Sequence, residues 1–512
     1  MAGSYLPRHL HWTSIPAHKN ATLLQPPADR PRSRWPTAIF SHGLGGNRNA
    51  YSYLAGSLAS YGVVVICPEH RDGSAALTLI RDPQSQNHKR TRRVVPYVRL
   101  PHTQIREIWD ARNNQLRIRL WELGLIFEAL TAIDRGDGPT IASNLNHSTP
   151  QAALAQFTNA LDILEPGKVI FSGHSFGAVT TVQLLKSTYA GHPPGHEMMP
   201  HPLFTPSKTA AIARQITPAN PTILLDMWCF PLLAASTAPL YNLPLPCYAP
   251  GGPGGSALLA VESNTFFSWT EHLHAKARIL SPDPTARTVT AELFQRPSSG
   301  DKPAPATAET EAEGGDTDDD GSETETDTKE GHSEISRPNF FYVSSAAHLS
   351  QSDFAILFPR LTKRVFKSDR PDRVLRLNVR AQLQFLRENG VVVAGTASGD
   401  LVDDCGRGQG QGHGHGHSRG THYDPKGEWL AEDGTILRRE KGIVEGWEWI
   451  DVVGLGGDKV YPSELDILEG GKGEQGARAE EGEREMQEEM ETVIEGVAEG
   501  GLKEVVAVGK TE

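Results

Sequence analysis

The segment Gly173-His174-Ser175-Phe176-Gly177 has the residue types and spacing of a serine nucleophile on a sharp turn. An apolar run over residues 169–172 precedes it, and a helix-like run over residues 178–185 follows it. In the G-x-S-x-G pattern, a tight strand-to-helix turn lifts the serine hydroxyl above the sheet edge, and glycines flank it because the backbone leaves no room for a Cβ atom. The alternative is a turn whose serine only caps a helix. The flanking strand and helix favour Ser175 as a nucleophile.

A serine nucleophile needs a base, and the base needs a carboxylate that orients it. In one large class of hydrolases these residues follow the chain order Ser, Asp or Glu, then His. Asp226 ends an apolar run, so its carboxylate is expected at the C-terminal edge of a strand, where parallel sheets place ligands. His348 follows a late apolar run and a loop of small residues, which is the third position. Asp226 alone would equally suit a helix cap, but the ordered set of three residues is more specific than any one of them.

Such a site also needs two N–H groups directed at the negative charge that develops on the substrate oxygen. One is expected from Phe176, the residue after the nucleophile. The other is expected from the glycine-rich loop over residues 41–46, whose glycines permit the backbone angles that turn an amide inward. We predict that Leu44 supplies this second N–H, the alternative being a plain glycine-rich turn.

The elements that must position these residues alternate between short apolar strands and helical segments. This alternation is typical of βαβ units and a mostly parallel sheet. The run at 63–67 is β-branched throughout, which predicts a strand buried on both faces. The expected strands cover residues 37–41, 63–67, 169–172, 222–225 and 340–344, and the expected helices cover residues 51–60, 103–132 and 373–388.

Charge is distributed unevenly along the 512 residues, whose formal net charge is −12. Residues 301–334 carry a local net charge of −11, and residues 464–499 carry −10. The remainder of the chain is therefore mildly basic. This fits a solvated surface or contact with anionic lipid headgroups, and we expect no nucleic-acid partner.

The composition divides the chain into five parts. Residues 35–390 are the expected catalytic domain, interrupted by an insert at about 297–337 whose composition predicts disorder. The dipeptide Asp433-Gly434, which lies between two short strand-like runs, predicts a hairpin turn in an extension over residues 426–463. The other three parts are a Pro-rich N-terminal segment at 1–34, a Gly/His-rich linker at 391–425 and an acidic tail at 464–512.

Targeting and cofactor signals point to a cytoplasmic protein. The four cysteines have no pairing rhythm, and the first residues contain no apolar region of a signal peptide. No apolar run approaches the ~18 residues of a transmembrane helix. The tract His413-Gly-His415-Gly-His417 could bind zinc or nickel weakly, but a glycine-spaced tract has no preformed geometry, so we favour incidental low complexity and expect no metal site.

Five segments in order resemble the platelet-activating factor acetylhydrolases, the single-chain, calcium-independent group VII phospholipases A2 of the α/β-hydrolase superfamily. They are Ser41-His-Gly-Leu-Gly45, Glu69-His-Arg-Asp72, Gly173-His-Ser-Phe-Gly177, Leu225-Asp-Met-Trp-Cys-Phe-Pro-Leu232, and Ala347-His348 with Asp353-Phe354. The resemblance covers roughly residues 35–390. It implies an α/β-hydrolase fold, a triad of Ser175, Asp226 and His348, and oxyanion donors at Leu44 and Phe176.

By this resemblance the reaction is hydrolysis of a short or oxidised sn-2 acyl ester of a glycerophospholipid, with no metal or organic cofactor. The partners implied are the phospholipid substrate and, transiently, a membrane surface. The chain departs from the family in a long segment between Ser175 and Asp226, in the acidic insert, and in residues 1–34, which do not supply the antiparallel strands that family members carry there. We therefore expect an incomplete N-terminus.

Two other functions remain open on the sequence. A general carboxylesterase or cutinase-like hydrolase would keep the fold and the triad but change the substrate. A catalytically impaired lipid- or protein-binding module would account for the missing strands at the N-terminus.

Overall fold

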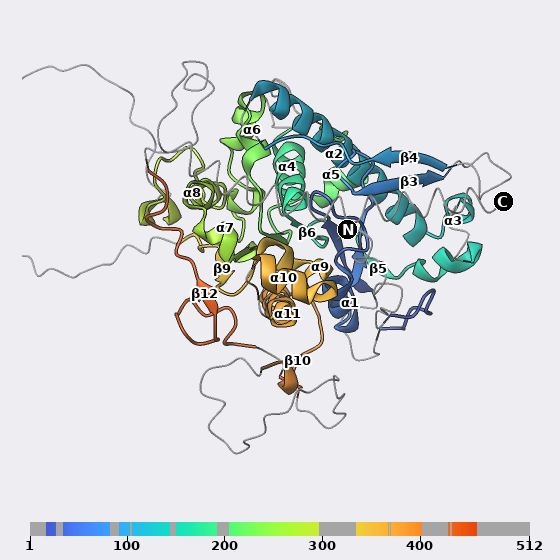
Figure 1. Ribbon diagram of the computed structural model, residues 1–512. Helices are drawn as coiled ribbons and strands as arrows, with labels where there is room; N and C mark the ends of the chain where they lie inside the picture. Colours follow the sequence, from blue (N-terminus) through green and yellow to red (C-terminus); the bar gives the residue numbers. More distant parts are fainter. Residues whose placement is uncertain are drawn as a thin grey trace, which may run out of the picture.

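The computed structural model describes the chain in several ranges, which Figure 1 draws as ribbon. The acidic insert to residue 333, the His413–His417 tract and the acidic tail lie outside the described residues, as does most of the Gly/His-rich linker. The described ranges are 17–26, 34–81, 92–102, 105–143, 150–191, 204–295, 334–366, 368, 370–401, 429–430 and 433–457.

A central sheet, eight-stranded within the described residues, runs in the order β12-β9-β8-β7-β6-β1-β2, with β5 pairing with β1. All its pairings are parallel except that of β12 with β9. This confirms the predicted α/β fold with a mostly parallel sheet. The strands are β1 (Trp35–Ser41), β2 (Val64–Ile66), β5 (Leu161–Asp162), β6 (Ile170–His174), β7 (Thr222–Leu225), β8 (Leu258–Ser263), β9 (Asn339–Val343) and β12 (Trp447–Trp449).

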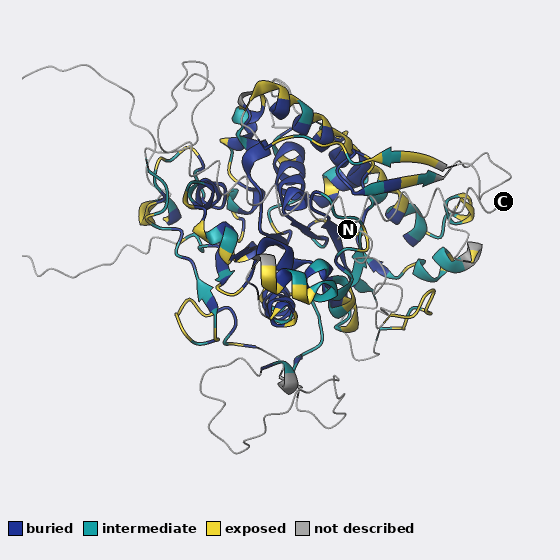
Figure 2. Cartoon of the chain, in the orientation of Figure 1, coloured by how far each residue is buried: buried dark blue, intermediate teal, exposed yellow. Residues whose placement is uncertain are grey.

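Alternate residues of the strands enter two separate apolar cores. On one face Ile39, Phe171 and Leu224 pack with residues of α2 (Arg106–Asp134) and α4 (Phe176–Ala190). On the other face, Phe40 and Val261 pack with α1 (Ser52–Ser60) and α11 (Pro371–Glu388). This follows from the two-residue period of a strand. Figure 2 shows the central strands buried between the two helical layers.

Helix α2 contains 29 residues and confirms the helix predicted near 103–132. Trp109, Leu116, Leu123 and Phe127 are buried along one face, as expected for apolar residues at helical spacing. The predicted helices at 51–60 and 373–388 are likewise confirmed by α1 and α11.

Two strand predictions need correction. The run at 63–67 forms β2, but its residues are only half-buried, because β2 is the last strand at one end of the sheet. Strand β8 was not anticipated from the sequence at all, although all six of its residues are buried between β7 and β9. Its run Leu-Leu-Ala-Val-Glu-Ser ends in charged and polar residues, so its apolar pattern is short and resembles a helix segment equally well.

The hairpin predicted around Asp433-Gly434 is wrong. Strand β11 (Trp429–Leu430) pairs with β10 (Thr396–Ala397) on its N-terminal side, and β12 pairs with β9 of the central sheet. The extension therefore adds an antiparallel strand to the catalytic domain. A separate hairpin, β3 (Leu77–Arg81) with β4 (Arg92–Pro96), lies beside α2 in Figure 1.

Within the described residues, no helix is long and apolar enough to span a membrane. The remaining helical elements are short. They are α3 (Gly138–Ala142), η3 (Gln151–Phe157), α5 (Ala211–Gln215), η4 (Phe230–Leu233), η5 (Ala235–Thr237), α6 (Ala238–Tyr241), η6 (Pro246–Tyr248), η7 (Gly254–Ala257), α7 (Asn264–Ser268), α8 (Thr270–Ile279), η8 (Ala291–Phe294), η9 (His348–Gln351), α9 (Asp353–Leu357), α10 (Pro359–Phe366) and η10 (Ser398–Leu401).

Candidate active site

Ser175 lies on the turn between β6 and α4, in the sharp geometry that its sequence context predicts. Its φ of 55° is positive, a conformation that non-glycine residues seldom adopt. A Cβ atom on Gly173 would lie 2.4 Å from the Gly177 carbonyl carbon, and one on Gly177 would lie 1.9 Å from the Ser41 carbonyl oxygen. Both glycines are therefore required because the turn packs directly against itself and against β1.

Asp226 follows β7 and also has a positive φ, of 42°. Its backbone N–H donates to the Val261 carbonyl of the neighbouring strand over 2.9 Å. Its Oδ1 accepts a hydrogen bond of 2.6 Å from the Ser263 N–H. The strained backbone turns the carboxylate across the sheet edge, which leaves Oδ2 free to meet His348.

His348 joins the other two residues. Its Nδ1 lies 2.9 Å from Asp226 Oδ2, and its Nε2 lies 3.1 Å from Ser175 Oγ. The hydrogen-bond network assigns the tautomer with the proton on Nδ1, which donates to the carboxylate. Nε2 is then free of a proton and can accept the one from serine. The structure thus brings Ser175, Asp226 and His348 into one hydrogen-bonded chain, although 173 residues separate the serine from the histidine.

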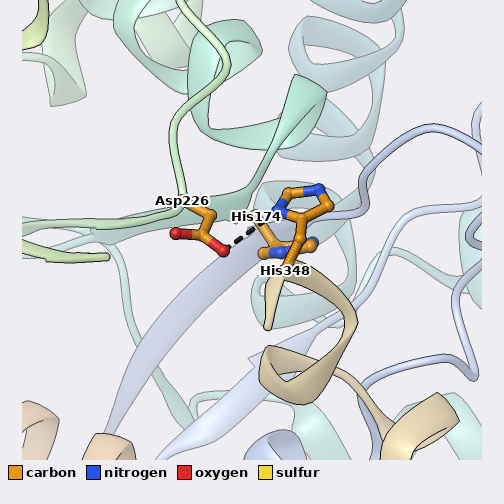
Figure 3. Close-up of side chains that lie close together, drawn as sticks. All are labelled: His174, Asp226 and His348. Atoms are coloured by element: carbon orange, nitrogen blue, oxygen red, sulfur yellow. Dashed lines mark hydrogen bonds and ion pairs between the residues drawn. The ribbon is translucent and has the colours of Figure 1, made fainter. Parts of the chain in front are cut away.

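Two rings hold the imidazole of His348 in place. His174 stacks on one side with centroids 4.5 Å apart, and Phe266 of α7 stacks on His348 at 4.4 Å. Figure 3 shows His174 beside His348, with Asp226 reaching toward the His348 ring. The Tyr51 hydroxyl, 2.8 Å from His174 Nδ1, in turn fixes the His174 ring. Neither His174 nor Phe266 was assigned a role from the sequence, because their stacking exists only in the folded chain.

The loop that carries His348 is tied to the opposite side of the site. Both carboxylate oxygens of Asp353 accept hydrogen bonds from the first turn of α1, from the N–H groups of Ser52 at 2.6 Å and Tyr53 at 2.9 Å. The N-terminus of a helix favours a negative charge and leaves its first N–H groups unpaired. This contact therefore explains the Asp353 of the fifth sequence motif as an anchor of the histidine loop.

Burial sets the protonation of the hydrogen-bonded chain. Burial, together with the smaller effect of the nearby Lys276 ammonium, lowers the pKa of His348 to about 3. Burial also raises the pKa of Asp226 to about 6, against the influence of Lys276 and of the Ser263 hydrogen bonds. At neutral pH the imidazole is thus neutral and the carboxylate ionised, which is the state that a general base requires.

The glycine loop predicted to carry an oxyanion donor lies against the nucleophile. A Cβ atom on Gly43 would lie 3.1 Å from the Ser175 Cβ, so a larger residue there would press on the nucleophile turn. The loop is held by the Gly43 N–H, which donates to the Tyr51 hydroxyl, and by the Gly45 N–H, which donates to the Ser74 carbonyl over 2.7 Å. The N–H groups of Leu44 and Phe176 meet no hydrogen-bond acceptor in the described part of the chain.

A buried guanidinium lies beneath this loop. Arg119 of α2 donates from Nη1 to the His42 carbonyl at 2.8 Å and pairs through Nε with Asp72 at 2.7 Å. Its carbon Cζ lies 4.5 Å from the centroid of the Phe176 ring. Arg119 therefore contacts both segments that carry the candidate oxyanion donors. Sequence reasoning missed it, although the Glu69-His-Arg-Asp72 segment had pointed to Asp72.

A second Ser-His-carboxylate chain lies next to Arg119. Ser41 Oγ is 2.9 Å from His70 Nε2, and His70 Nδ1 is 3.0 Å from Glu122 Oε2. Ser41 is 1% exposed and sits in a strand of the sheet rather than on a turn. We assign this chain to fixing β1 and the glycine loop, because Ser41 lies within a strand rather than on a strand-to-helix turn and its hydroxyl also contacts Arg119.

His174, Asp226 and His348 also offer ligand atoms within 4.8 Å of one another, as a metal site would. However, Asp226 and His348 hydrogen-bond to each other, and the two imidazole rings stack at an interplanar angle of 28°. The nitrogen lone pairs lie in the ring planes and so do not converge on one point. The arrangement suits proton transfer better than metal binding.

Aromatic side chains fill the space on one side of Ser175. Trp228, which donates its backbone N–H to the Ser175 carbonyl at 3.4 Å, stacks on Phe230 at 5.4 Å and contacts the Phe176 ring. All three rings are fully buried. The nucleophile is itself only 2% exposed. The site is therefore enclosed by rigid, bulky walls.

Comparisons with known proteins agree with this geometry. A family profile described as "Platelet-activating factor acetylhydrolase, isoform II" matches residues 8–242. A Schizosaccharomyces pombe protein named "Putative phospholipase A2" is 27% identical over 74% of this chain and 72% of its own length. Two proteins named "Platelet-activating factor acetylhydrolase" match shorter stretches: the one from Bos taurus is 34% identical over 34% of this chain, and the one from Cavia porcellus is 33% identical over 33%.

Each of these two mammalian matches covers 35% of the relative's own length. The matched profile nevertheless includes the glycine loop, the nucleophile turn and Asp226, and the fungal relative matches most of the chain. Together with the α/β fold, these findings show that the chain is similar to the platelet-activating factor acetylhydrolase family over residues 8–242, and to the fungal protein over most of its length.

Proposed function

We propose that this protein is a serine esterase that hydrolyses the sn-2 acyl ester of glycerophospholipids through an acyl-enzyme. The observation that carries the proposal is the chain of hydrogen bonds from Ser175 through His348 to Asp226. Similarity to proteins named phospholipase A2 and platelet-activating factor acetylhydrolase supports the choice of substrate.

In the first half of the reaction, His348 Nε2 takes the Ser175 proton while Oγ attacks the ester carbonyl carbon. Asp226 stabilises the imidazolium that results. The Leu44 and Phe176 N–H groups donate to the oxygen that becomes negative. When the bond from the acyl carbon to the glycerol oxygen breaks, the His348 proton passes to that oxygen and the lysophospholipid leaves.

In the second half, His348 takes a proton from water, and the hydroxide attacks the acyl carbon of the enzyme. The same two N–H groups donate to the oxyanion again. Collapse of the intermediate breaks the bond to Ser175 Oγ, which regains its proton from His348, and the carboxylic acid is released. Every proton in this cycle passes through Nε2 of one imidazole.

The walls beside Ser175 support a preference for short acyl chains. Phe176, Trp228 and Phe230 are fully buried and stacked or in contact, so they leave a long acyl chain no space on their side unless they move. Close-packed cores resist such movement. We therefore include acetyl and other short sn-2 chains as the preferred substrates.

Transient contact with a membrane surface is part of the proposal. Ile118, Trp121 and Leu125 of α2 are exposed by 39%, 47% and 46%, and they lie three and four residues apart on one helical face. Exposed Trp and aliphatic side chains on one face suit the boundary between lipid headgroups and acyl chains. Sedimentation with phosphatidylcholine vesicles, compared between the wild type and Trp121→Ser, tests this contact.

Labelling with a fluorophosphonate probe tests the catalytic assignment. We expect the wild type to react, Ser175→Ala and His348→Ala not to react, and Ser41→Ala to keep its reactive serine. The Ser41 variant is a matched control, because that serine also contacts a histidine and a carboxylate. Labelling that persisted in Ser175→Ala would contradict the assignment.

Competition identifies the substrate. We expect 2-acetyl phosphatidylcholine to slow labelling and 2-palmitoyl phosphatidylcholine to have little effect. Labelling that neither lipid slows, with rapid turnover of p-nitrophenyl esters, would instead indicate a general carboxylesterase. A folded wild type that does not react at all would indicate a binding module.

A further inference from the structure

A buried ion pair lies directly behind the candidate carboxylate. Glu262 of β8 and Lys276 of α8 form a salt bridge, and both side chains are completely buried. The catalytic cycle described above uses neither residue. A buried ion pair adds little to stability, because desolvation of both charges offsets their attraction. Its place beside the site therefore calls for another explanation.

Strand register puts Glu262 next to Asp226. Leu225 of β7 pairs with Val261 of β8, so the following residues on the two parallel strands are neighbours. The two backbone contacts of Asp226, to the Val261 carbonyl and from the Ser263 N–H, flank Glu262 on both sides. The side chain of Glu262 contacts Lys276 through Oε2.

Burial raises the pKa of Glu262, and the neighbouring Asp226 adds to the rise, while the Lys276 ammonium opposes it. Burial also raises the pKa of Asp226, to about 6, and Lys276 again opposes the rise. The Lys276 ammonium therefore favours the ionised form of both carboxyl groups.

Lys276 also lies near His348, the hydrogen-bond partner of Asp226. Its Nζ lies 4.8 Å from the centroid of the Phe266 ring, whose plane stacks on the His348 imidazole at 4.4 Å. The ammonium, the phenyl ring and the imidazole thus lie in sequence. A fixed positive charge at this distance disfavours a second positive charge on the imidazole and favours the negative charge on Asp226.

We propose that Glu262 and Lys276 are positioning residues for the Asp226–His348 pair: the buried ammonium behind Phe266 disfavours a charge on His348 and favours one on Asp226 before substrate binds, and Glu262 holds the ammonium in place. This inference rests on the proposed function. It adds to that function the groups that set the pH range in which His348 can act as a base.

Several other titratable groups surround the Asp226–His348 pair. His348 faces His174 from β6 and Lys276 and His272 from α8. Asp226 faces Glu262 and Lys276. Around Glu262 and Lys276 the remaining titratable neighbours are Cys229 and, near it, Arg278. The Lys276 ammonium lowers the pKa of each of four neighbouring groups: Asp226, Glu262, His272 and His348.

The test measures the rate constant of fluorophosphonate labelling from about pH 2.5 to about pH 9, because this rate reports the base and needs no knowledge of the substrate. In Lys276→Met we expect the acid limb of the profile to move up by about one pH unit. In Lys276→Arg, which keeps the charge, and in Glu262→Gln, which leaves the Lys276 charge in place, we expect no upward movement of the limb.

Lys186→Met is the matched control. Lys186 of α4 is also a buried lysine, but its Nζ donates to the Tyr241 carbonyl at 2.8 Å, away from the triad. We expect this variant to lose stability and to keep the wild-type acid limb. A limb that moved equally in both lysine variants would mean that any buried lysine has the effect, which would overturn the inference.

A second variant covers the case in which Lys276→Met does not fold. If Lys276→Met does not fold, Glu262→Gln combined with Lys276→Met removes both ionisable groups and leaves no unpaired buried charge. We expect this double variant to show the same upward shift. A folded, labelled variant without the Lys276 charge whose limb stays in the wild-type position would overturn the inference. A wild type without labelling at Ser175 would instead overturn the proposed function.

Discussion

Arg119 and His42 are 77 residues apart in the chain, yet the guanidinium donates to the His42 carbonyl over 2.8 Å. The carbonyl precedes the glycine loop that contains Leu44. The same guanidinium pairs with Asp72 and lies over the Phe176 ring, so one buried cation connects the two segments that carry the candidate oxyanion donors. The spacing between those segments is thus set by a residue in neither of them.

Replacing Arg119 is expected to reduce catalysis more than substrate binding. Arg119→Lys keeps the charge but cannot reach Asp72, Ser74 and the His42 carbonyl together, because lysine lacks the planar fork. We expect kcat for ester hydrolysis to fall by at least about tenfold, since loss of one oxyanion donor costs about 10²–10³. Steady-state kinetics would measure the effect.

Arg380→Lys is the control for Arg119→Lys. Arg380 of α11 is buried and pairs with Asp433 at 2.8 Å on the other face of the sheet. Both variants should lower the unfolding temperature, whereas only the Arg119 variant should lower kcat. Equal kcat values for the two variants would mean that Arg119 serves stability alone.

Trp228 is expected to restrict acyl-chain length. Trp228→Leu removes ring volume beside Ser175, so hydrolysis of 2-hexanoyl relative to 2-acetyl phosphatidylcholine should rise by about tenfold, the scale of one or two methylene groups in an apolar pocket. The ratio of the two kcat/KM values measures this. An unchanged ratio with normal folding would show that the acyl chain lies elsewhere.

Two glycine-to-alanine substitutions should change stability in opposite directions. Gly177→Ala would place a Cβ atom 1.9 Å from the Ser41 carbonyl oxygen, so we expect a loss of at least about 3 kcal/mol in the free energy of unfolding. Gly56→Ala, on the exposed face of α1, meets nothing within 4 Å and should gain about 0.5–1 kcal/mol. Urea denaturation would compare them. A tolerated Gly177→Ala would contradict the tight packing of the nucleophile turn.

Stability is expected to fall as the pH decreases below the usual histidine pKa of ~6.5. Burial lowers the pKa of a set of histidines, so in this range the unfolded chain binds more protons than the folded chain, and each contributes a loss of up to about 1.4 kcal/mol per pH unit. This set consists of His42, His70, His174, His272 and His348.

Asp226 and Glu262 act in the opposite direction, because their raised pKa values let the folded chain bind protons first. Glu69, Glu122 and Asp353, whose pKa values burial also raises, act in the same direction and offset a further part of the loss. Denaturant midpoints measured between about pH 7 and about pH 5 would show the decline. A constant midpoint over this range would mean that the histidines become protonated without unfolding.

The sequence by itself determined the elements that are encoded locally. The nucleophile turn is readable because sterics demand glycine at 173 and 177. Strands β1, β6 and β7 are readable because continuous apolar runs suit a sheet buried on both faces. The chain order of Ser175, Asp226 and His348 was sufficient to name three residues that the fold then brought into contact.

Only the tertiary structure decided what surrounds these residues. Strand β8 gave no distinct pattern, so neither the neighbourhood of Glu262 and Asp226 nor the approach of Lys276 to Phe266 could be anticipated. The hairpin expected at Asp433-Gly434 did not form, because Trp429–Leu430 pairs with Thr396–Ala397 and the residues after Gly434 form turns rather than a strand. Buried polar contacts such as that of Arg119 with His42 join residues whose spacing has no period, and a single sequence contains no signal for a pairing that exists only after the sheet has formed.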